Sequence, residues 1–406
     1  MAKTIRWASL VTAVALVAAA CGSSDSGGSD KGGPTGKALT IGVYAALAGT
    51  LNEPGAQSGL DAAEDYINKV KGGINGRPIT FDVCKSDGTP ETIVSCTNKF
   101  VENKIPVTFD ASVAAAAAAV PALTSAGVPI VGAWAGSPAI TAAKYGTAFY
   151  WNGDAQVALG TLDLMKTTGA KSASLAVIDF PAAHDYFDKL IVPAGKAQGL
   201  EITPQYVAQG SINSEVLAAR ELATKPDAAG VLQLAEADCT GLLKALRTQG
   251  FKGTLLPGPC TEFIDDMGAQ AEGAALLTRA WVPKTKTYAP ADVQKQLDAF
   301  ETSMKNVGKE ADINSIRAVS VFAGLVTLSD VLGDISGDVT AKSVTTQLEG
   351  LKDFPAFLQG TITCDGKAWA SSPGACSSQV LYVEVQKDGT LKPISDGLKT
   401  IAQPAA

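Results

Sequence analysis

Short apolar runs alternate along the chain with segments in which apolar residues recur at helical spacing. The first run covers residues 39–44, and the segment 57–71 follows it with Leu60, Ala63 and Ile67 on one face. Strands separated by amphipathic helices predict parallel sheets with helices on both faces. The alternation starts again after residue 150. The expected fold is therefore α/β, with two doubly wound open-sheet lobes joined by crossover strands.

The individual elements can be placed from this alternation. Thr89-Pro90-Glu91 predicts a helix start, because threonine caps a helix and proline suits its first position. An alanine-rich helix is expected to begin at 114–119. Strands are predicted at 39–44, 81–84, 107–109, 128–131, 174–178, 202–207, 230–234, 254–256 and 273–282. Further helices are predicted at 182–198, 214–223, 241–248, 291–305 and 313–332, and a hairpin at 360–385.

The first residues carry the features of an export signal. Lys3 and Arg6 form a basic start, residues 8–20 are apolar, and the small residues 18–20 precede Cys21. About 13 apolar residues, at roughly 1.5 Å each, cannot cross a hydrocarbon core of about 30 Å. Residues 1–20 are thus predicted to be a signal peptide, and Cys21 is the expected site of lipidation. Ordinary secretion with a chance cysteine is the alternative.

Residues 21–37 are rich in glycine and serine and predict a flexible tether to the lipid anchor. Six cysteines follow the tether in three close pairs, and export to an oxidising compartment favours disulfides. The alternative, a metal site, lacks a CxxC or HxxxH spacing, so no metal and no cofactor is expected. The predicted pairs are Cys84 with Cys96, Cys239 with Cys260, and Cys364 with Cys376.

The composition and net charge indicate which classes of partner are not expected. The chain has 406 residues, of which 46% are hydrophobic and 18% charged, so a globular fold of two domains is expected. The net charge is -7 and the pI about 5.0. An acidic chain without a basic patch is not expected to bind nucleic acid.

Several segments of the chain resemble a known protein family. GGINGRP at residues 72–78 looks like the turn of type I periplasmic solute-binding proteins, the branched-chain amino-acid and amide receptors of ABC importers. Segments 41–55, 126–140, 167–178 and 242–253 match in the same order, so the resemblance runs from about 38 to 387. It implies a Venus-flytrap fold, with lobe 1 at 38–155 and 284–358 and lobe 2 at 156–283 and 359–401.

The ligand is expected beyond the carboxyl ends of the strands. Glu53 lies in the matching segment after the first strand. Ser112 heads the alanine helix and resembles the family's serine that holds a ligand carboxylate, although a plain helix cap is the alternative. Trp134, Ala135 and Gly136 match the segment that presents backbone groups, with Gly136 in place of the usual threonine. Trp134 either stacks on a planar ligand or is simply buried.

The second lobe departs from the family pattern. The family's DxxYG-like sequence is replaced here by Asp179-Phe180, so the aromatic partner is absent or moved to Phe180. Where amino-acid receptors carry a carboxylate for the ligand ammonium, this chain has Thr261, with Glu236 and Glu262 close by. Either glutamate could substitute or could be a solvated surface charge. An amide, a carboxylate or an aromatic acid therefore stays open as the ligand.

The resemblance implies a small-molecule ligand and a membrane permease as partners, with capture by hinge closure. An enzyme is not expected: His184 is the single histidine, and no GxSxG elbow is present. His184 is expected to cap or face a helix, with a ligand contact as the alternative. We expect an extracytoplasmic, lipid-anchored binding protein of an ABC importer that captures an amino acid, amide or related carboxylate. The alternatives are a ligand-sensing lipoprotein without transport and a hydrolase that uses Asp179 and Glu236.

Overall fold

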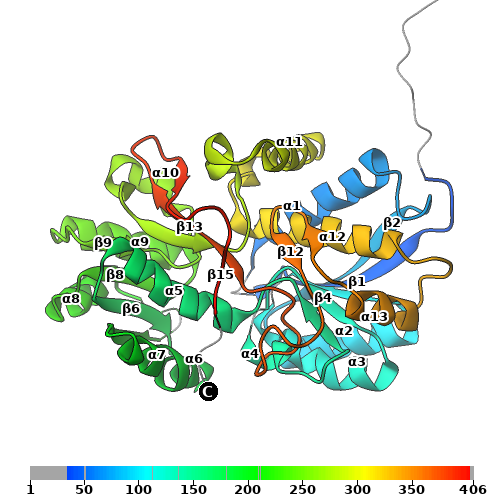
Figure 1. Cartoon of the computed structure of the whole chain (residues 1–406), viewed down its shortest axis with the longest axis horizontal. Helices are drawn as coiled ribbons and strands as arrows, with labels where there is room; N and C mark the ends of the chain where they lie inside the picture. Colours follow the sequence, from blue (N-terminus) through cyan, green and yellow to red (C-terminus); the bar gives the residue numbers. More distant parts are fainter. Residues whose placement is uncertain are drawn as a thin grey trace, which may run out of the picture. The chain divides into compact units, whose positions relative to one another are not determined.

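The computed structural model describes residues 34–49, 52–111, 113–135, 137–179, 181–208, 210 and 212–402. Within this part the chain forms two lobes, each built on a parallel sheet with helices on both faces (Figure 1). The expected fold class is confirmed. The expected lobe limits stay a prediction.

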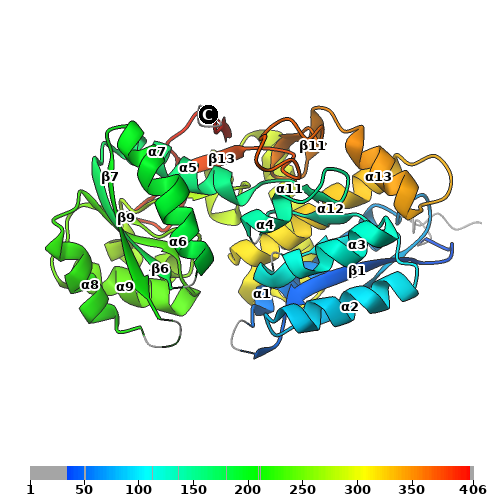
Figure 2. The ribbon, with the colours of Figure 1, turned by 90° about the horizontal axis from the view of Figure 1, so that it is seen from below.

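The first sheet has five parallel strands in the order β2-β1-β3-β4-β5. Helices α1 (Pro54–Asp65) and α12 (Ile316–Gly333) cover one face, and α2 (Pro90–Glu102) and α3 (Val120–Ala126) cover the other (Figure 2). The threonine expected to cap α2 does so, because the Thr89 side chain accepts a hydrogen bond from Thr92 N. The strands are β1 (Leu39–Ala46), β2 (Ile79–Ser86), β3 (Thr108–Asp110), β4 (Ile130–Gly132) and β5 (Ala148–Tyr150).

The second sheet has four parallel strands in the order β7-β6-β8-β9, which repeats the order of the first sheet. Helices α8 and α9 lie on one face, and α5, α6 and α7 on the other (Figure 2). Its strands are β6 (Ser172–Ile178), β7 (Glu201–Val207), β8 (Ala228–Gln233) and β9 (Thr254–Leu256). Its helices are α5 (Asp154–Thr168), α6 (Pro181–Tyr186), α7 (Val192–Ala197), α8 (Ser214–Ala223) and α9 (Glu236–Thr248).

The C-terminal part of the chain contradicts one expectation. Residues 360–385 do not form a hairpin: β12 (Gly360–Ile362) pairs with β11 (Phe354–Ala356), and β13 (Gln379–Val385) pairs with β10 (Ala275–Thr278) and β14 (Leu391–Pro393). The cause is the loop between β12 and β13, which bonds to β5 instead, since Cys376 N donates to Tyr150 O at 2.7 Å. Strand β15 (Lys399–Thr400) also pairs with β13.

The remaining helices are short, apart from α11. The helix expected at 182–198 is three consecutive segments, because the π-helical turn η4 (Phe187–Ile191) separates α6 from α7. The others are η2 (Tyr66–Val70), η3 (Ala114–Ala119), α4 (Pro138–Thr141), α10 (Phe263–Met267), η5 (Gly268–Ala271), η6 (Pro283–Tyr288), α11 (Ala291–Asn306), η7 (Glu310–Asp312) and α13 (Ala341–Glu349).

Helix α12 forms the centre of the first lobe. In the described part of the chain it alone is long and apolar enough to cross a membrane, but 78% of it is buried inside the fold. It is therefore a core helix. Two glycines let neighbouring elements approach it: a Cβ at Gly59 of α1 would lie 2.6 Å from Ala318 O, and one at Gly324 would lie 2.8 Å from Ala133 Cβ.

The three expected disulfide pairs are present. Cys84–Cys96 joins β2 to α2, Cys239–Cys260 joins α9 to the loop after β9, and Cys364–Cys376 closes the loop between β12 and β13. Each sulfur pair closes a short loop of 12 or 21 residues. Such cross-links stabilise a fold by about 3 kcal/mol each in the chain-entropy account.

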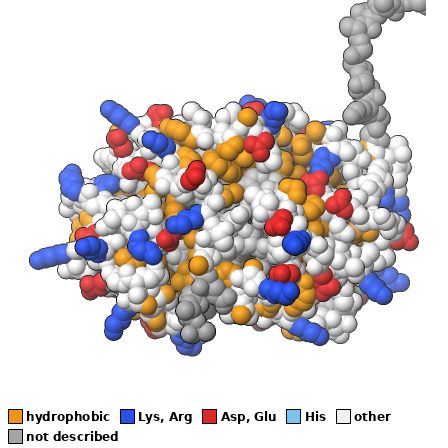
Figure 3. Space-filling view, in the orientation of Figure 1, with side chains coloured by type: hydrophobic (Ala, Val, Ile, Leu, Met, Phe, Trp, Pro, Cys, Tyr) orange, Lys and Arg blue, Asp and Glu red, His pale blue; other side chains and the backbone are white. Residues whose placement is uncertain are grey.

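Acidic and basic side chains are interspersed on the face that Figure 3 shows, with apolar atoms between them. This face carries no broad basic surface.

Candidate functional site

The carboxyl ends of five parallel strands lead to one group of residues. Glu53 follows β1, Ala111 follows β3, and Trp134 follows β4, whereas Glu236 and Thr261 follow β8 and β9 of the second sheet. In each sheet the direction in which successive strands are added reverses once. The reversal lies between β1 and β3 in the first sheet and between β6 and β8 in the second. Ligands of open α/β sheets bind at such points. We therefore take this group as the candidate site.

Trp134 lies beside the charged groups of two arginines. Its side chain is buried, and the guanidinium carbons of Arg279 and Arg317 lie 4.8 and 4.9 Å from its ring centroid. Arg317 belongs to α12 of the first lobe, and Arg279 directly follows β10. Guanidinium groups within about 6 Å of an indole are held by the ring quadrupole. The tryptophan is thus both buried and a platform for two cations.

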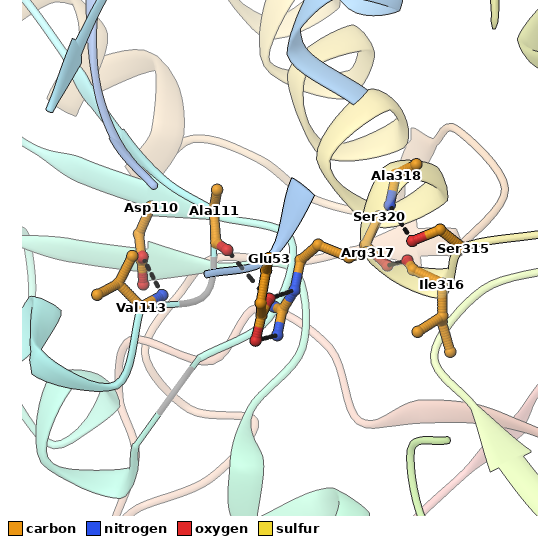
Figure 4. Close-up of polar contacts among 9 residues, drawn as sticks. All are labelled: Glu53, Asp110, Ala111, Val113, Ser315, Ile316, Arg317, Ala318 and Ser320. Carbon is orange, nitrogen blue, oxygen red and sulfur yellow. Dashed lines mark hydrogen bonds and ion pairs between the residues drawn. The ribbon is translucent and has the colours of Figure 1, made fainter. Parts of the chain in front are cut away.

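Arg317 is held in place by the start of α1 and the end of β3. Its Nη2 donates to Glu53 Oε1 at 2.9 Å, its Nε pairs with Glu53 Oε2, and its Nη1 donates to Ala111 O at 3.4 Å (Figure 4). The helix turn that carries it is capped by Ser315, whose Oγ accepts from Ala318 N. The two-point pairing fixes the plane of the guanidinium.

A buried carboxylate fixes the loop beneath this pair. Asp110 ends β3, and its Oδ1 accepts from Val113 N at 2.7 Å (Figure 4). Its Oδ2 accepts from the Tyr150 hydroxyl at 2.8 Å. Burial raises the pKa of Tyr150 well above its ordinary value, and the Asp110 carboxylate adds to the rise. The loop after β3 is therefore tied to β5 by charge-assisted hydrogen bonds.

Glu236 forms the second lobe's part of the site. It begins α9, and its carboxylate accepts from Thr261 N at 3.1 Å and from Glu262 N at 3.3 Å. Burial raises the pKa of Glu236 to about 7 against those two hydrogen bonds, and repulsion by the carboxylates of Glu262 and Glu53 adds to the rise. Because Glu53 belongs to the first lobe, charges of both lobes act on this group.

Thr261 presents a hydroxyl beside Glu236. Its side chain is 4% exposed, and its Oγ1 has no hydrogen-bond partner in the described part of the chain. A buried hydroxyl without a partner costs free energy that a ligand can restore. The adjacent disulfide Cys239–Cys260 joins the helix of Glu236 to the loop of Thr261, so both residues are held by one cross-link.

Several residues predicted from the sequence have other surroundings. The N–H of Ala135 donates to Asn152 O at 3.1 Å and is committed to the backbone. His184 binds Asp179 Oδ1 at 2.8 Å and stacks on the Tyr206 ring at 3.8 Å between centroids. Asp179 therefore pairs with the imidazole rather than with Glu236. Four predicted residues lie outside the described part of the chain: Cys21, Ser112, Gly136 and Phe180.

The structure adds two arginines that sequence reasoning missed. Arg279 follows a strand that was predicted to continue to residue 282, whereas β10 ends at Thr278. Had the strand been predicted to end at residue 278, Arg279 would have been a candidate ligand-binding residue, because it directly follows the strand. Arg317 lies in the first turn of a late helix, where no strand end draws attention to it. Among the described residues no group of three His, Cys, Asp or Glu side chains could hold a metal ion.

Comparison with known proteins assigns the chain to a family. The sequence profile described as periplasmic binding protein matches residues 38–389. The chain belongs to the periplasmic binding protein family. The expected resemblance to type I members is thereby confirmed. No curated protein matches this periplasmic binding protein.

Solved structures share the fold of this periplasmic binding protein at low sequence identity. A leucine-binding protein from Thermotoga maritima is 14% identical, with a TM-score of 0.71 over 89% of this chain and 99% of its own. An ABC transporter substrate-binding protein from Sphaerobacter thermophilus is 19% identical, with a TM-score of 0.73 over 90% and 98%. A solute-binding protein of an ABC transporter from R. palustris, in complex with benzoate, is 19% identical with a TM-score of 0.72 over 90% and 98%.

The family sets the general role of the chain. Its members are binding proteins, so this periplasmic binding protein is an extracytoplasmic receptor for a small ligand. Its relatives are receptors rather than enzymes.

Proposed function

We propose that this periplasmic binding protein is the lipid-anchored solute receptor of an ABC importer and that its solute carries a carboxylate. Cys21 would hold the lipid, and closure of the two lobes over the solute would create the surface that a permease recognises. Among an amino acid, an amide and a related carboxylate, the residues around Trp134 favour the carboxylate.

One observation carries the choice of solute. The guanidinium groups of Arg279 and Arg317 lie within 4.9 Å of the Trp134 ring centroid, at the carboxyl end of β4. Guanidinium forks match carboxylates geometrically. The R. palustris relative in complex with benzoate gives a first compound of this chemistry to test.

The second lobe supports the same solute class. Near neutral pH the carboxyl of Glu236, with its pKa raised to about 7, is partly protonated. A protonated carboxyl beside the Thr261 hydroxyl is a neutral hydrogen-bonding surface that a second polar group of the solute can contact. An ammonium group would instead favour the ionised form of Glu236. We therefore place α-amino acids second.

Thermal unfolding against a panel of solutes tests this proposal. The panel contains benzoate, an aliphatic carboxylate, benzamide, leucine and urea. At a hundred times its dissociation constant a bound solute stabilises the protein by about 2.7 kcal/mol, which shifts the midpoint by a few degrees. We expect a shift with benzoate and none with benzamide, because only the former has a carboxylate. A shift with benzamide but not with benzoate would refute the carboxylate assignment, and a shift with leucine alone would show that the solute is an α-amino acid.

The anchor and the importer need separate measurements. Mass spectrometry of the protein from its own membrane should show a diacylglycerol on Cys21, and Cys21→Ser should release the protein from the membrane fraction. With a permease encoded beside it, the solute-loaded protein should stimulate ATP hydrolysis. A membrane-bound protein that binds solute but stimulates no such permease would favour the sensing alternative.

A further inference from the structure

Three buried amide side chains at the crossovers between the lobes have polar atoms without partners. Asn152, Gln156 and Gln359 are 3%, 0% and 4% exposed. In the described part of the chain, Oδ1 of Asn152 and both amide atoms of Gln156 and Gln359 have no hydrogen-bond partner. Buried side-chain polar atoms are paired in the large majority of cases. Five unpaired atoms on three residues therefore call for a physical cause.

These amides lie at or beside the passages of the chain from one lobe to the other. Asn152 lies between β5 of the first sheet and α5, and Gln156 lies in the first turn of α5. Gln359 lies in the turn between β11 and β12, beside the start of β13, because the Gln379 side chain contacts Thr361. Gly153 makes room for the Gln156 amide, because a Cβ at this position would collide with Gln156 Oε1. Position 153 requires glycine because the Gln156 amide approaches its backbone closely. The φ angle of Gly153 is -95°, which other residues also adopt.

One hydrogen bond joins the crossovers. Asn152 Nδ2 donates to the backbone O of Gln379, at the start of β13, at 2.6 Å. The side chain of Gln379 extends this connection, since its Oε1 accepts from Thr361 N at 3.3 Å, two residues after Gln359. The unpaired amides thus flank a polar link between the first and the last crossover.

We propose that Asn152, Gln156 and Gln359 form the two-state element of the hinge and exchange hydrogen-bond partners when the lobes rotate. The conformation described here leaves them unpaired, and a second conformation pairs them. The unpaired amides raise the free energy of the present conformation relative to the second. They therefore set the ratio of the two populations. The proposal rests on the two-lobed fold and not on the chemistry of the solute.

Distance measurements in the ligand-free protein test the proposal. Nitroxide labels are attached at Val70→Cys and Val216→Cys, which replace exposed residues of η2 and α8 in the two lobes. The full chain also carries Cys21→Ser, so that with the three disulfides formed only the introduced thiols react. Pulsed electron spin resonance then gives the populations at the distance set by the structure and at any second distance.

Gln156→Met decides between the outcomes, because methionine keeps the size of glutamine but needs no partner. We expect the population at the structure's distance to rise by about fivefold or more relative to the second population. Gln359→Met should act in the same direction, and it decides the question if Gln156→Met does not fold. Gln205→Met is the matched control, because this buried amide is paired with Ser174 Oγ at 3.1 Å in β7, away from the crossovers. It should leave the ratio unchanged.

Two results would overturn the proposal. If bridging waters satisfy the amides in the present conformation, methionine would lower that population or leave the ratio as it was. A wild-type distribution that lies entirely at the structure's distance would also refute it, since no second state would exist. No solute is present in the experiment, so either result is independent of the proposed carboxylate receptor.

Discussion

The carboxyl group of Glu236 changes its ionisation state near neutral pH. Burial raises its pKa to about 7, so the carboxyl is mostly protonated at pH 6 and mostly ionised at pH 8. An ionised Glu236 repels an anionic solute, and a protonated one does not. The affinity for benzoate should therefore rise by about tenfold from pH 8 to pH 6, the equivalent of one pKa unit. Isothermal calorimetry at both pH values measures this change.

Glu236→Gln is the control for that pH dependence. Glutamine cannot ionise but keeps an oxygen that accepts from Thr261 N, as the carboxylate does at 3.1 Å. The variant should bind benzoate equally at both pH values, with an affinity close to that of the wild type at pH 6. A wild type whose affinity does not change with pH would remove Glu236 from the solute's surroundings.

Arg279 provides a second test among single residues. Its guanidinium carbon lies 4.8 Å from the Trp134 ring centroid, on a different element from Arg317. Loss of a hydrogen bond to a charged group costs about 1.5–3 kcal/mol, so Arg279→Gln should weaken benzoate binding by roughly 10- to 100-fold. Arg220→Gln, which removes an exposed arginine of α8, should leave binding unchanged. Equal affinities in both variants would contradict the role of Arg279.

The sequence indicated part of this site and not the rest. Trp134, Glu236 and Thr261 follow strands, and the rule that ligands bind beyond carboxyl ends selects them. Arg317 was missed because it reaches the site from a helix and lies 183 residues after Trp134 in the chain, counted from 134 to 317. Its partnership with Glu53 is a tertiary contact that no local pattern shows.

At the scale of elements, the close packing of α1 on α12 positions the first-lobe side of the site. Glu53 immediately precedes α1, and Arg317 lies in the first turn of α12, so the distance between the helices sets their pairing. Gly59 permits the approach, because a Cβ there would lie 2.6 Å from Ala318 O and 2.9 Å from Val321 Cβ. Gly59→Ala should lower the free energy of unfolding by about 1–3 kcal/mol through overpacking. Urea denaturation measures the loss.

Gly333 supplies the matched control for this glycine. It ends α12, and a Cβ there would meet nothing within 4 Å. Gly333→Ala should leave stability unchanged or raise it by up to about 1 kcal/mol, because alanine favours the helix more than glycine does. If Gly59→Ala were equally neutral, the helices would have room to separate and would not fix the Glu53–Arg317 pair.

Local patterns predicted most elements but not their pairing. The helix at 214–223 and the strand at 254–256 have the bounds that periodicity gave. The missed elements include β5, α5 and α13. Strand β5 has only three residues, too few to show a strand period, and no helix was predicted at 154–168 or at 341–349. The expected hairpin at 360–385 was wrong because the loop between its strands bonds to Tyr150, which is more than 200 residues away in the chain.

At the scale of the whole molecule, one buried carboxyl should govern how stability depends on alkaline pH. Glu221 of α8 is fully buried, and burial raises its pKa from 4.5 to about 9. The folded protein therefore keeps this proton at pH values where the unfolded chain has lost it. Its contribution is complete below pH 4.5 and is lost as the pH rises through 9. Carboxylates with lowered pKa, such as Asp87 at about 2, act in the opposite sense and only in acid.

The slope of stability against pH isolates Glu221. Between about pH 7.5 and 8.5 Glu236 is largely ionised in the folded and unfolded states, so Glu221 accounts for the proton difference. The free energy of unfolding should fall by about 1.4 kcal/mol per pH unit in this interval. Glu221→Gln, which is neutral in both states, should remove the slope. Urea denaturation at three pH values for both proteins measures it. A wild-type slope near zero would mean that Glu221 is ionised in the folded protein, with its charge satisfied by groups such as the backbone of Gly230 and Ala176.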